Sequence, residues 1–290
     1  MSRLIFLALS IVVALFILSC AATHPGDDDR IPPYRPNLIA HIGFVGDRML
    51  DPEIFEEVYV LGTDGLPLRD DNAGINAVPQ GNEIRLQWDK VEDNPGGRGV
   101  QWINIYRYAG IPNLPEEYDD EDLLEMFHFI DRVPGNSLSF LDTFEGQHTA
   151  IGINWHYFIK AIDHAGNISE LSDIRNFELI NKARLESPAH RTPFTNDEIR
   201  TTEFTWSFEG NASNMRFIIF EFDGNDNIRY FWSSDVFFDQ FEEQFTFIYN
   251  GPALPMGGYL WRVDMRGWAH ASTELTRGSK SEMREFQITQ

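Results

Sequence analysis

Apolar and polar residues alternate in several short segments from residue 84 onward. Residues 84–88 read IRLQW, residues 102–108 read WINIYRY, and the run over 154–163 reads NWHYFIKAID. Such alternation is typical of β-strands that bury one face. The turn-forming sequences NPGG at 94–97 and AGN at 165–167 separate these segments. The pattern therefore predicts short antiparallel strands rather than long helices.

The second half of the chain repeats this pattern. Residues 203–208 place Trp206 where the earlier strand has Trp88, and residues 258–264 place Tyr259 where the earlier strand has Tyr157. Short strands, frequent turns and no alternating long helices indicate an all-β fold. Further strands are expected at 138–141, 174–179, 185–188 and 280–288. We place a domain boundary near residues 181–182, which divides the chain into domains over 34–181 and 182–290.

Two motifs resemble the fibronectin type III family. They are IRLQWDKVED at 84–93, and YFIKAID at 157–163 with the AGNIS hairpin that follows it. The resemblance implies two tandem immunoglobulin-like (fibronectin type III-like) β-sandwiches with short helical insertions, a fold that is not generally catalytic. It implies four core residues: Trp88, Tyr157, Trp206 and Tyr259. It also implies that the hydroxyl of the buried tyrosine bonds to backbone at a corner.

Three segments exceed a bare sandwich, over 46–80, 116–129 and 230–249. The first is an extension or an edge-covering insertion. The second is expected to be a helix, because Leu123, Leu124, Phe127 and Ile130 recur at helical spacing and acidic residues crowd its start.

The third segment is rich in aromatic residues. Its helical spacing predicts one apolar face made of Phe237, Phe238, Phe241, Phe245 and Ile248. This face either covers a sheet edge or forms an exposed platform for a glycan or peptide. Tyr230 and Trp232 lie on the strand before it and are the candidate binding residues, with Trp268 as a further ring of a coplanar set.

The N-terminus has the pattern of a secretory signal peptide. Arg3 precedes an uncharged apolar run over 4–18, and Cys20 follows that run. The run is shorter than the ~20 residues that a bilayer span needs, which disfavours an uncleaved anchor. An ordinary signal peptide with a chance cysteine is the other alternative.

Residues 17–20 resemble the lipobox of bacterial lipoproteins. The resemblance implies that the signal peptide 1–19 is removed and that Cys20 carries the lipid, with palmitate among its acyl chains. It implies a lipid-anchored protein of the bacterial cell envelope. Ala21 after the cysteine points to the outer membrane.

Charge and composition exclude some classes of function. The net charge of −22 disfavours nucleic acid as a partner. Cys20 is the only cysteine, so its lipidation leaves no thiol for a disulfide or a nucleophile. Residues 20–33 are expected to be a flexible tether. The acidic run 27–29 within it is either a weak cation site or simply solvated.

No sequence motif for catalysis, a metal or a cofactor is present. The chain lacks the G-x-S-x-G, H-E-x-x-H, P-loop and G-x-G-x-x-G patterns, and its histidines are scattered. His156 is expected to point outward, opposite to Tyr157. Residues 223–227 (DGNDN) resemble a calcium loop but fit a hairpin turn better.

The sequence therefore predicts a non-catalytic envelope lipoprotein. Its two modules would serve protein interaction or spacing, with the membrane as a partner through Cys20 and an envelope protein or glycan as the other. The alternative is a carbohydrate-binding accessory lipoprotein of a polysaccharide-use system. An enzyme is the third and least favoured possibility.

Overall fold

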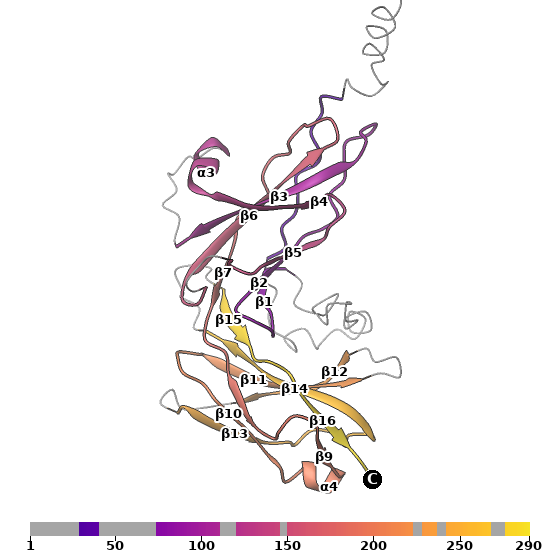
Figure 1. Ribbon diagram of the computed structural model, residues 1–290, viewed down its shortest axis with the longest axis vertical. Coiled ribbons are helices and arrows are strands. Elements are labelled where there is room, and N and C mark those ends of the chain that lie inside the picture. The colour runs from indigo at the N-terminus through magenta and orange to yellow at the C-terminus, as the bar shows by residue number, and fades with distance from the viewer. Residues whose placement is uncertain are drawn as a thin grey trace, which may run out of the picture.

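The computed structural model describes residues 29–40, 74–110, 120–145, 150–222, 228–236, 242–267 and 276–290. These residues form many short strands in three sheets, together with two short helices (Figure 1). The all-β class expected from the alternating pattern is confirmed.

Seven strands and one helix come from the first half of the chain. The strands are β1 (Asn76–Ala77), β2 (Ile84–Gln87), β3 (Val100–Ala109), β4 (His128–Pro134), β5 (Ser139–Asp142), β6 (Asn154–Asp163) and β7 (Arg175–Leu179), and the helix is α3 (Asp120–Met126).

The second half contributes the other nine strands and the other helix of the described residues. The strands are β8 (Arg184–Ser187), β9 (Thr192–Phe194), β10 (Glu203–Ser207), β11 (Asn214–Phe222), β12 (Ile228–Val236), β13 (Gln244–Ile248), β14 (Gly257–Arg266), β15 (Arg277–Lys280) and β16 (Arg284–Ile288), and the helix is α4 (Asn196–Ile199).

The expected strand over 280–288 is divided into β15 and β16. Ser281 lies between them with its side chain buried. Its hydroxyl accepts a hydrogen bond from the Val263 amide at 2.9 Å, and its own amide donates to the Val263 carbonyl at 2.9 Å. A side chain thus takes the place of a backbone acceptor at this point of the sheet. In the first half, Ser169 accepts from the Ala161 amide at 2.9 Å in the same way.

Two large hydrophobic cores follow one another along the chain. The first gathers buried residues between Leu38 and Leu179 and includes Trp88 and Tyr157. The second gathers buried residues from Ile180 to Ile288 and includes Trp206 and Tyr259. The change from one core to the next falls between Leu179 and Ile180.

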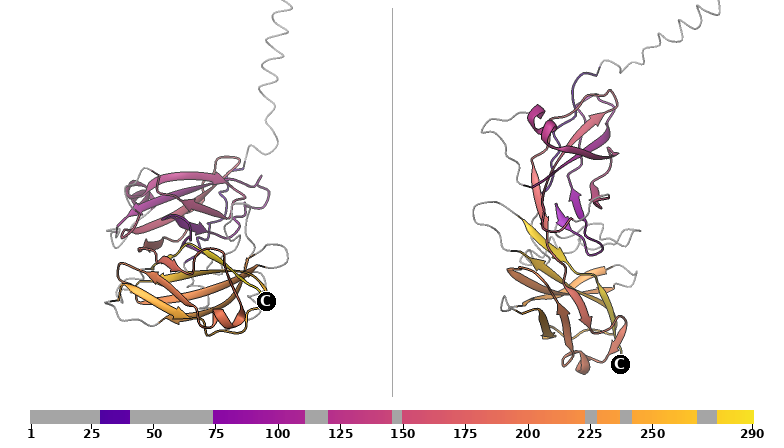
Figure 2. Two further views of the ribbon diagram at one scale, coloured as in Figure 1. Left: turned by 60° about the horizontal axis from the view of Figure 1, so that its bottom comes forward. Right: turned by 60° about the vertical axis from the view of Figure 1, so that its left-hand side comes forward.

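One long sheet runs through both cores, in the strand order β12-β11-β14-β15-β7-β6-β3-β4. Its two halves join where β15 pairs in parallel with β7, and the two smaller sheets are β1-β2-β5 and β13-β10-β8 (Figure 2). An ion pair between Arg277 and Glu178, 2.7 Å from Nη2 to Oε1, lies at this joint. Lys182 also bridges the halves, since its ammonium donates to the carbonyls of Val78 and Pro79 at 2.7 Å each.

Residues 29–40 lie along the first core. The amide of Tyr34 donates to the Glu92 carbonyl at 3.1 Å, and the amide of Ile39 donates to the Gln87 carbonyl at 3.0 Å. Pro33 is buried. The end of the expected tether, residues 29–33, is therefore packed against the protein. This segment lies toward the end of the molecule opposite to the C-terminus (Figure 1).

The helix expected over 116–129 is shorter in the structure. Residues 116–119 lie outside the described residues, and α3 ends at Met126. Phe129 and Ile130 belong to β4, because this segment pairs with β3. Leu123 is buried as expected, whereas Leu124 is 40% exposed.

The helix expected within 230–249 is wrong for its described part. Phe245 and Ile248 lie on β13, which pairs with β10 along all of its length. Phe245 is buried while Ile248 is 49% exposed, because side chains alternate between the two faces of a strand. The other three residues of the expected face, Phe237, Phe238 and Phe241, lie outside the described residues.

Candidate functional site

Tyr230 and Trp232 do not form a pair of exposed, coplanar rings. A β-bulge shifts the register between the pairs Ile219–Trp232 and Phe220–Tyr230, so the two side chains lie on opposite faces of β12. Tyr230 is 7% exposed. Trp232 is partly buried against the second core, with its ring 5.0 Å from that of Tyr249. The expected aromatic platform is wrong at this strand, and Trp268 lies outside the described residues.

The Tyr157 hydroxyl bonds to a carboxylate rather than to backbone. It donates to Asp142 Oδ2 at 2.9 Å. Arg107 Nη1 donates to both oxygens of the same carboxylate, at 2.8 and 2.6 Å. Burial first, and then the charge of Asp142, raise the pKa of Tyr157 well above its usual value. In the second core the Tyr259 hydroxyl does donate to backbone, at the Pro255 carbonyl 2.8 Å away.

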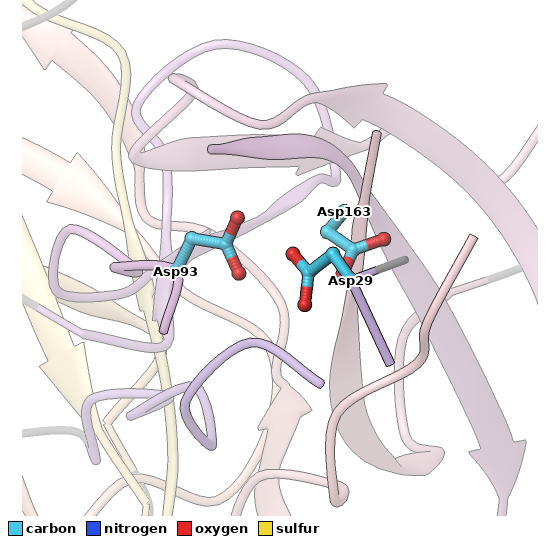
Figure 3. Close-up of side chains that lie close together, drawn as sticks. All are labelled: Asp29, Asp93 and Asp163. Carbon is cyan, nitrogen blue, oxygen red and sulfur yellow. The ribbon is translucent and has the colours of Figure 1, made fainter. Parts of the chain in front are cut away.

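Three carboxylates meet near the end of the molecule where residues 29–40 begin. Asp29, Asp93 and Asp163 each offer an oxygen, and these oxygens lie within 4.8 Å of one another (Figure 3). Carboxylate oxygens are the ligands that Ca²⁺ prefers in proteins. Asp29 belongs to the acidic run noted in the sequence, and residues 27 and 28 lie outside the described residues.

Each of these carboxylates already accepts hydrogen bonds from the loop that holds it. Asp163 Oδ1 accepts from the amides of Ala165 and Asn167 at 2.8 Å each. Asp93 Oδ2 accepts from the Gly99 amide at 2.8 Å. These bonds account for the acids as turn caps, with Asp followed by Gly or Asn as the sequence signal.

Asp163→Ala is expected to lower the free energy of unfolding by about 1–3 kcal/mol, because buried amide groups of the turn lose their acceptor. Asp163→Asn keeps an acceptor oxygen and removes a charge near two other acids, so it should stay within about 1 kcal/mol of the wild type. Urea denaturation of both variants measures the difference. Equal losses in the two variants would contradict the turn-cap role.

His156 points away from the first core, as expected, but it is buried rather than outward in solvent. Its exposed fraction is 8%. Burial lowers the pKa of the imidazole, and contacts with the backbone of Asn154 and Gly110 oppose this only in part. His156 is therefore neutral at neutral pH.

Acid is expected to destabilise the fold through His156. The unfolded chain binds a proton near the ordinary pKa of 6.5, while the folded state excludes that proton until a lower pH. The free energy of unfolding should thus fall between about pH 7 and pH 5.5. His156→Gln should flatten this dependence in denaturation curves measured across that range. An identical slope in both proteins would show that other groups cause the loss.

A cavity of about 400 Å³ lies where the two halves of the chain join. Burial lowers the pKa of Lys182 to about 8, and its ammonium bonds to two carbonyls. Arg284 donates to the carbonyls of Glu186 and Pro188, at 2.7 and 3.0 Å. The cationic lining is therefore engaged in holding the chain together. The cavity is lined by Lys182, Ala183, Arg184, Leu185, Glu282 and Arg284.

Comparisons with known proteins give no family. No family model matches the chain, and no curated protein matches it. A pectate lyase, Pel3 from Pectobacterium carotovorum, aligns with 42% of this chain and 30% of its own, at 11% identity and a TM-score of 0.23. A likeness of this size carries no argument about fold or activity.

Neither helix among the residues that the structure describes is long and apolar enough to cross a membrane. Cys20 and the segment 223–227 lie outside the described residues.

Proposed function

We propose that the protein is a non-catalytic lipoprotein of the bacterial envelope, held by Cys20 at the outer membrane. Its two modules present a surface to another envelope protein or act as a spacer. The observation that carries this proposal is the arrangement of the described chain. Residues 29–40 begin near one end of the molecule and the C-terminus lies at the other (Figure 1). A protein anchored before residue 29 would thus extend away from the lipid.

The proposal includes the finer fold, two tandem fibronectin type III-like β-sandwiches. Two successive cores support it, each with a tryptophan from a three-stranded sheet or its edge and a tyrosine from the long sheet. Trp88 and Tyr157 supply this pair in the first core, and Trp206 and Tyr259 in the second. The parallel joint of β7 with β15 and its ion pair suit a spacer, because they resist bending between the halves.

Replacing the lipidated cysteine tests the anchor. The wild-type protein should incorporate labelled palmitate and fractionate with membranes. Cys20→Ala should lose the label and leave the membrane fraction, while its circular dichroism stays that of a β protein. Crosslinking in cells should then capture a protein partner that depends on Cys20. A Cys20→Ala variant that stays with membranes would exclude the lipid anchor.

The alternative, a carbohydrate-binding accessory lipoprotein, loses its expected site because Tyr230 is buried. A saccharide site, if this chain has one, lies elsewhere in the fold.

A further inference from the structure

Polar side chains gather on the outer face of the long sheet, near the joint of its two halves. Across the strands Asn154 lies opposite Glu178, and His156 lies opposite Asn176. Arg277 of β15 lies beside Glu178. Paired residues on neighbouring strands point to the same face. We call this set the outer polar strip; it consists of Asn154, His156, Asn176, Glu178 and Arg277.

The other face of these strands belongs to the first core. Trp155 and Phe177, which alternate with the strip residues, are 3% and 0% exposed and pack in that core. The strip is thus a polar surface separate from the core. Helix α3 covers the same sheet face further along β6, where Phe158 packs against Leu123 and Phe127.

Two strip residues are buried without using their hydrogen-bonding atoms. Asn154 and His156 are each 8% exposed. Both side-chain amide atoms of Asn154, and Nδ1 of His156, have no hydrogen-bond partner among the described residues. Folded proteins rarely leave buried polar atoms unpaired, because each then carries its full desolvation penalty. Such atoms call for a partner that the chain itself does not provide.

A buried asparagine on the neighbouring strand shows the contrast. Asn104 of β3 is 6% exposed, and its amide group is paired. Its Oδ1 accepts from Arg132 Nε at 2.8 Å, and its Nδ2 donates to the Tyr106 hydroxyl at 3.4 Å. Burial of an amide on this sheet therefore does not by itself leave the amide unpaired.

The charges around the strip favour a neutral ligand. Glu178 and Arg277 neutralise each other in an ion pair of 2.7 Å. The net charge of −22 would repel an anion. The Asn154 amide presents a donor and an acceptor side by side, which suits groups that both accept and donate, as hydroxyls do.

An aromatic ring borders the strip. Tyr108 of β3 lies opposite His156 and is half-buried, with its ring 5.5 Å from that of Phe127. Tyrosine offers an apolar body and a polar tip, so it can contact the C–H groups of a polar ring compound.

We propose that the outer polar strip binds vicinal hydroxyl groups of a neutral saccharide, with Asn154 and His156 supplying the hydrogen bonds. The strip lies outside every segment that the sequence pattern singled out for binding. This inference does not depend on the lipid anchor.

Calorimetric titration of the purified full-length protein in detergent tests the proposal. The probes are glucose, galactose, mannose and N-acetylglucosamine, each of which carries vicinal hydroxyls. At least one should bind, and its binding should also raise the thermal midpoint. No binding by any of the four would overturn the proposal and leave ordered water as the partner of these atoms.

Variants locate the site. Asn154→Leu has a similar side-chain size and removes the unpaired atoms, so it should fold with an equal or higher thermal midpoint. Its saccharide affinity should fall by about tenfold or more, which corresponds to the loss of a well-placed hydrogen bond. His156→Gln should weaken binding independently. Asn104→Ala, on the neighbouring strand, should bind as the wild type does. Affinity unchanged in both Asn154→Leu and His156→Gln would overturn the assignment.

Discussion

Asp142→Ala is expected to lower the free energy of unfolding by about 3–5 kcal/mol, because it leaves a buried positive charge without its partner. Asp142 is 4% exposed, and the side chain of Arg107 is 12% exposed. The Arg107 guanidinium lies over the rings of Phe144 and Trp155, at 4.9 and 4.7 Å, so little solvent can replace the lost carboxylate.

The same substitution removes two further hydrogen bonds. The Tyr157 hydroxyl loses its acceptor at 2.9 Å, and the Phe144 amide loses its acceptor at 3.0 Å. The carboxylate thus connects β3, β5 and β6 at one point of the first core. Urea denaturation followed by tryptophan fluorescence measures the loss.

Asp173→Ala is the matched control for this prediction. Asp173 bonds with Arg35 and Arg175, but half of its side chain is exposed. Exposed pairs contribute little, so the cost should stay below about 1 kcal/mol. Similar losses from Asp142→Ala and Asp173→Ala would show that burial of the Arg107 pair does not govern its energy.

Trp206→Ala is expected to cost about 3–5 kcal/mol, because it opens a large cavity in the second core. Trp206 is fully buried. Its ring stacks with those of Phe217 and Phe245, at centroid distances of 6.4 and 6.0 Å. The loss should appear in the unfolding transition of the second core, measured by calorimetry.

Two other variants calibrate that result. Trp206→Phe keeps an aromatic ring and removes an indole N–H that has no partner among the described residues, so it should cost clearly less. Trp102→Ala changes a partly exposed ring beside Arg132 and should cost about 1 kcal/mol or less. A cost for Trp206→Phe equal to that for Trp206→Ala would argue that the N–H, rather than ring volume, matters.

Alternation along the chain was enough to predict most of the strands. The expected segments at 102–108, 154–163 and 174–179 lie within or over β3, β6 and β7. This succeeds because side-chain direction in a strand has a period of two, which any short window of sequence displays. The same reasoning failed at Phe245 and Ile248, whose spacing of three residues fits a helix but belongs to β13.

Which residues meet across the fold depended on pairing that no local window contains. The bulge in the β11–β12 pairing turned Tyr230 into the protein. Asp142 was not among the expected site residues, although its carboxylate receives the Tyr157 hydroxyl. The acids Asp29 and Asp163 are distant in sequence and meet only because residues 29–40 pack on the first core.

The sequence by itself determined the all-β class, the positions of most strands and the repeated tryptophan and tyrosine strands. It also supplied the acidic charge and the N-terminal pattern on which the proposed anchor rests. The tertiary structure decided which faces are buried, where the long sheet joins its halves, and that Asn154 and His156 share a buried polar face. Strand identity follows from local side-chain periodicity. Register, bulges and the partners of buried polar atoms follow from the free energy of the whole assembled sheet.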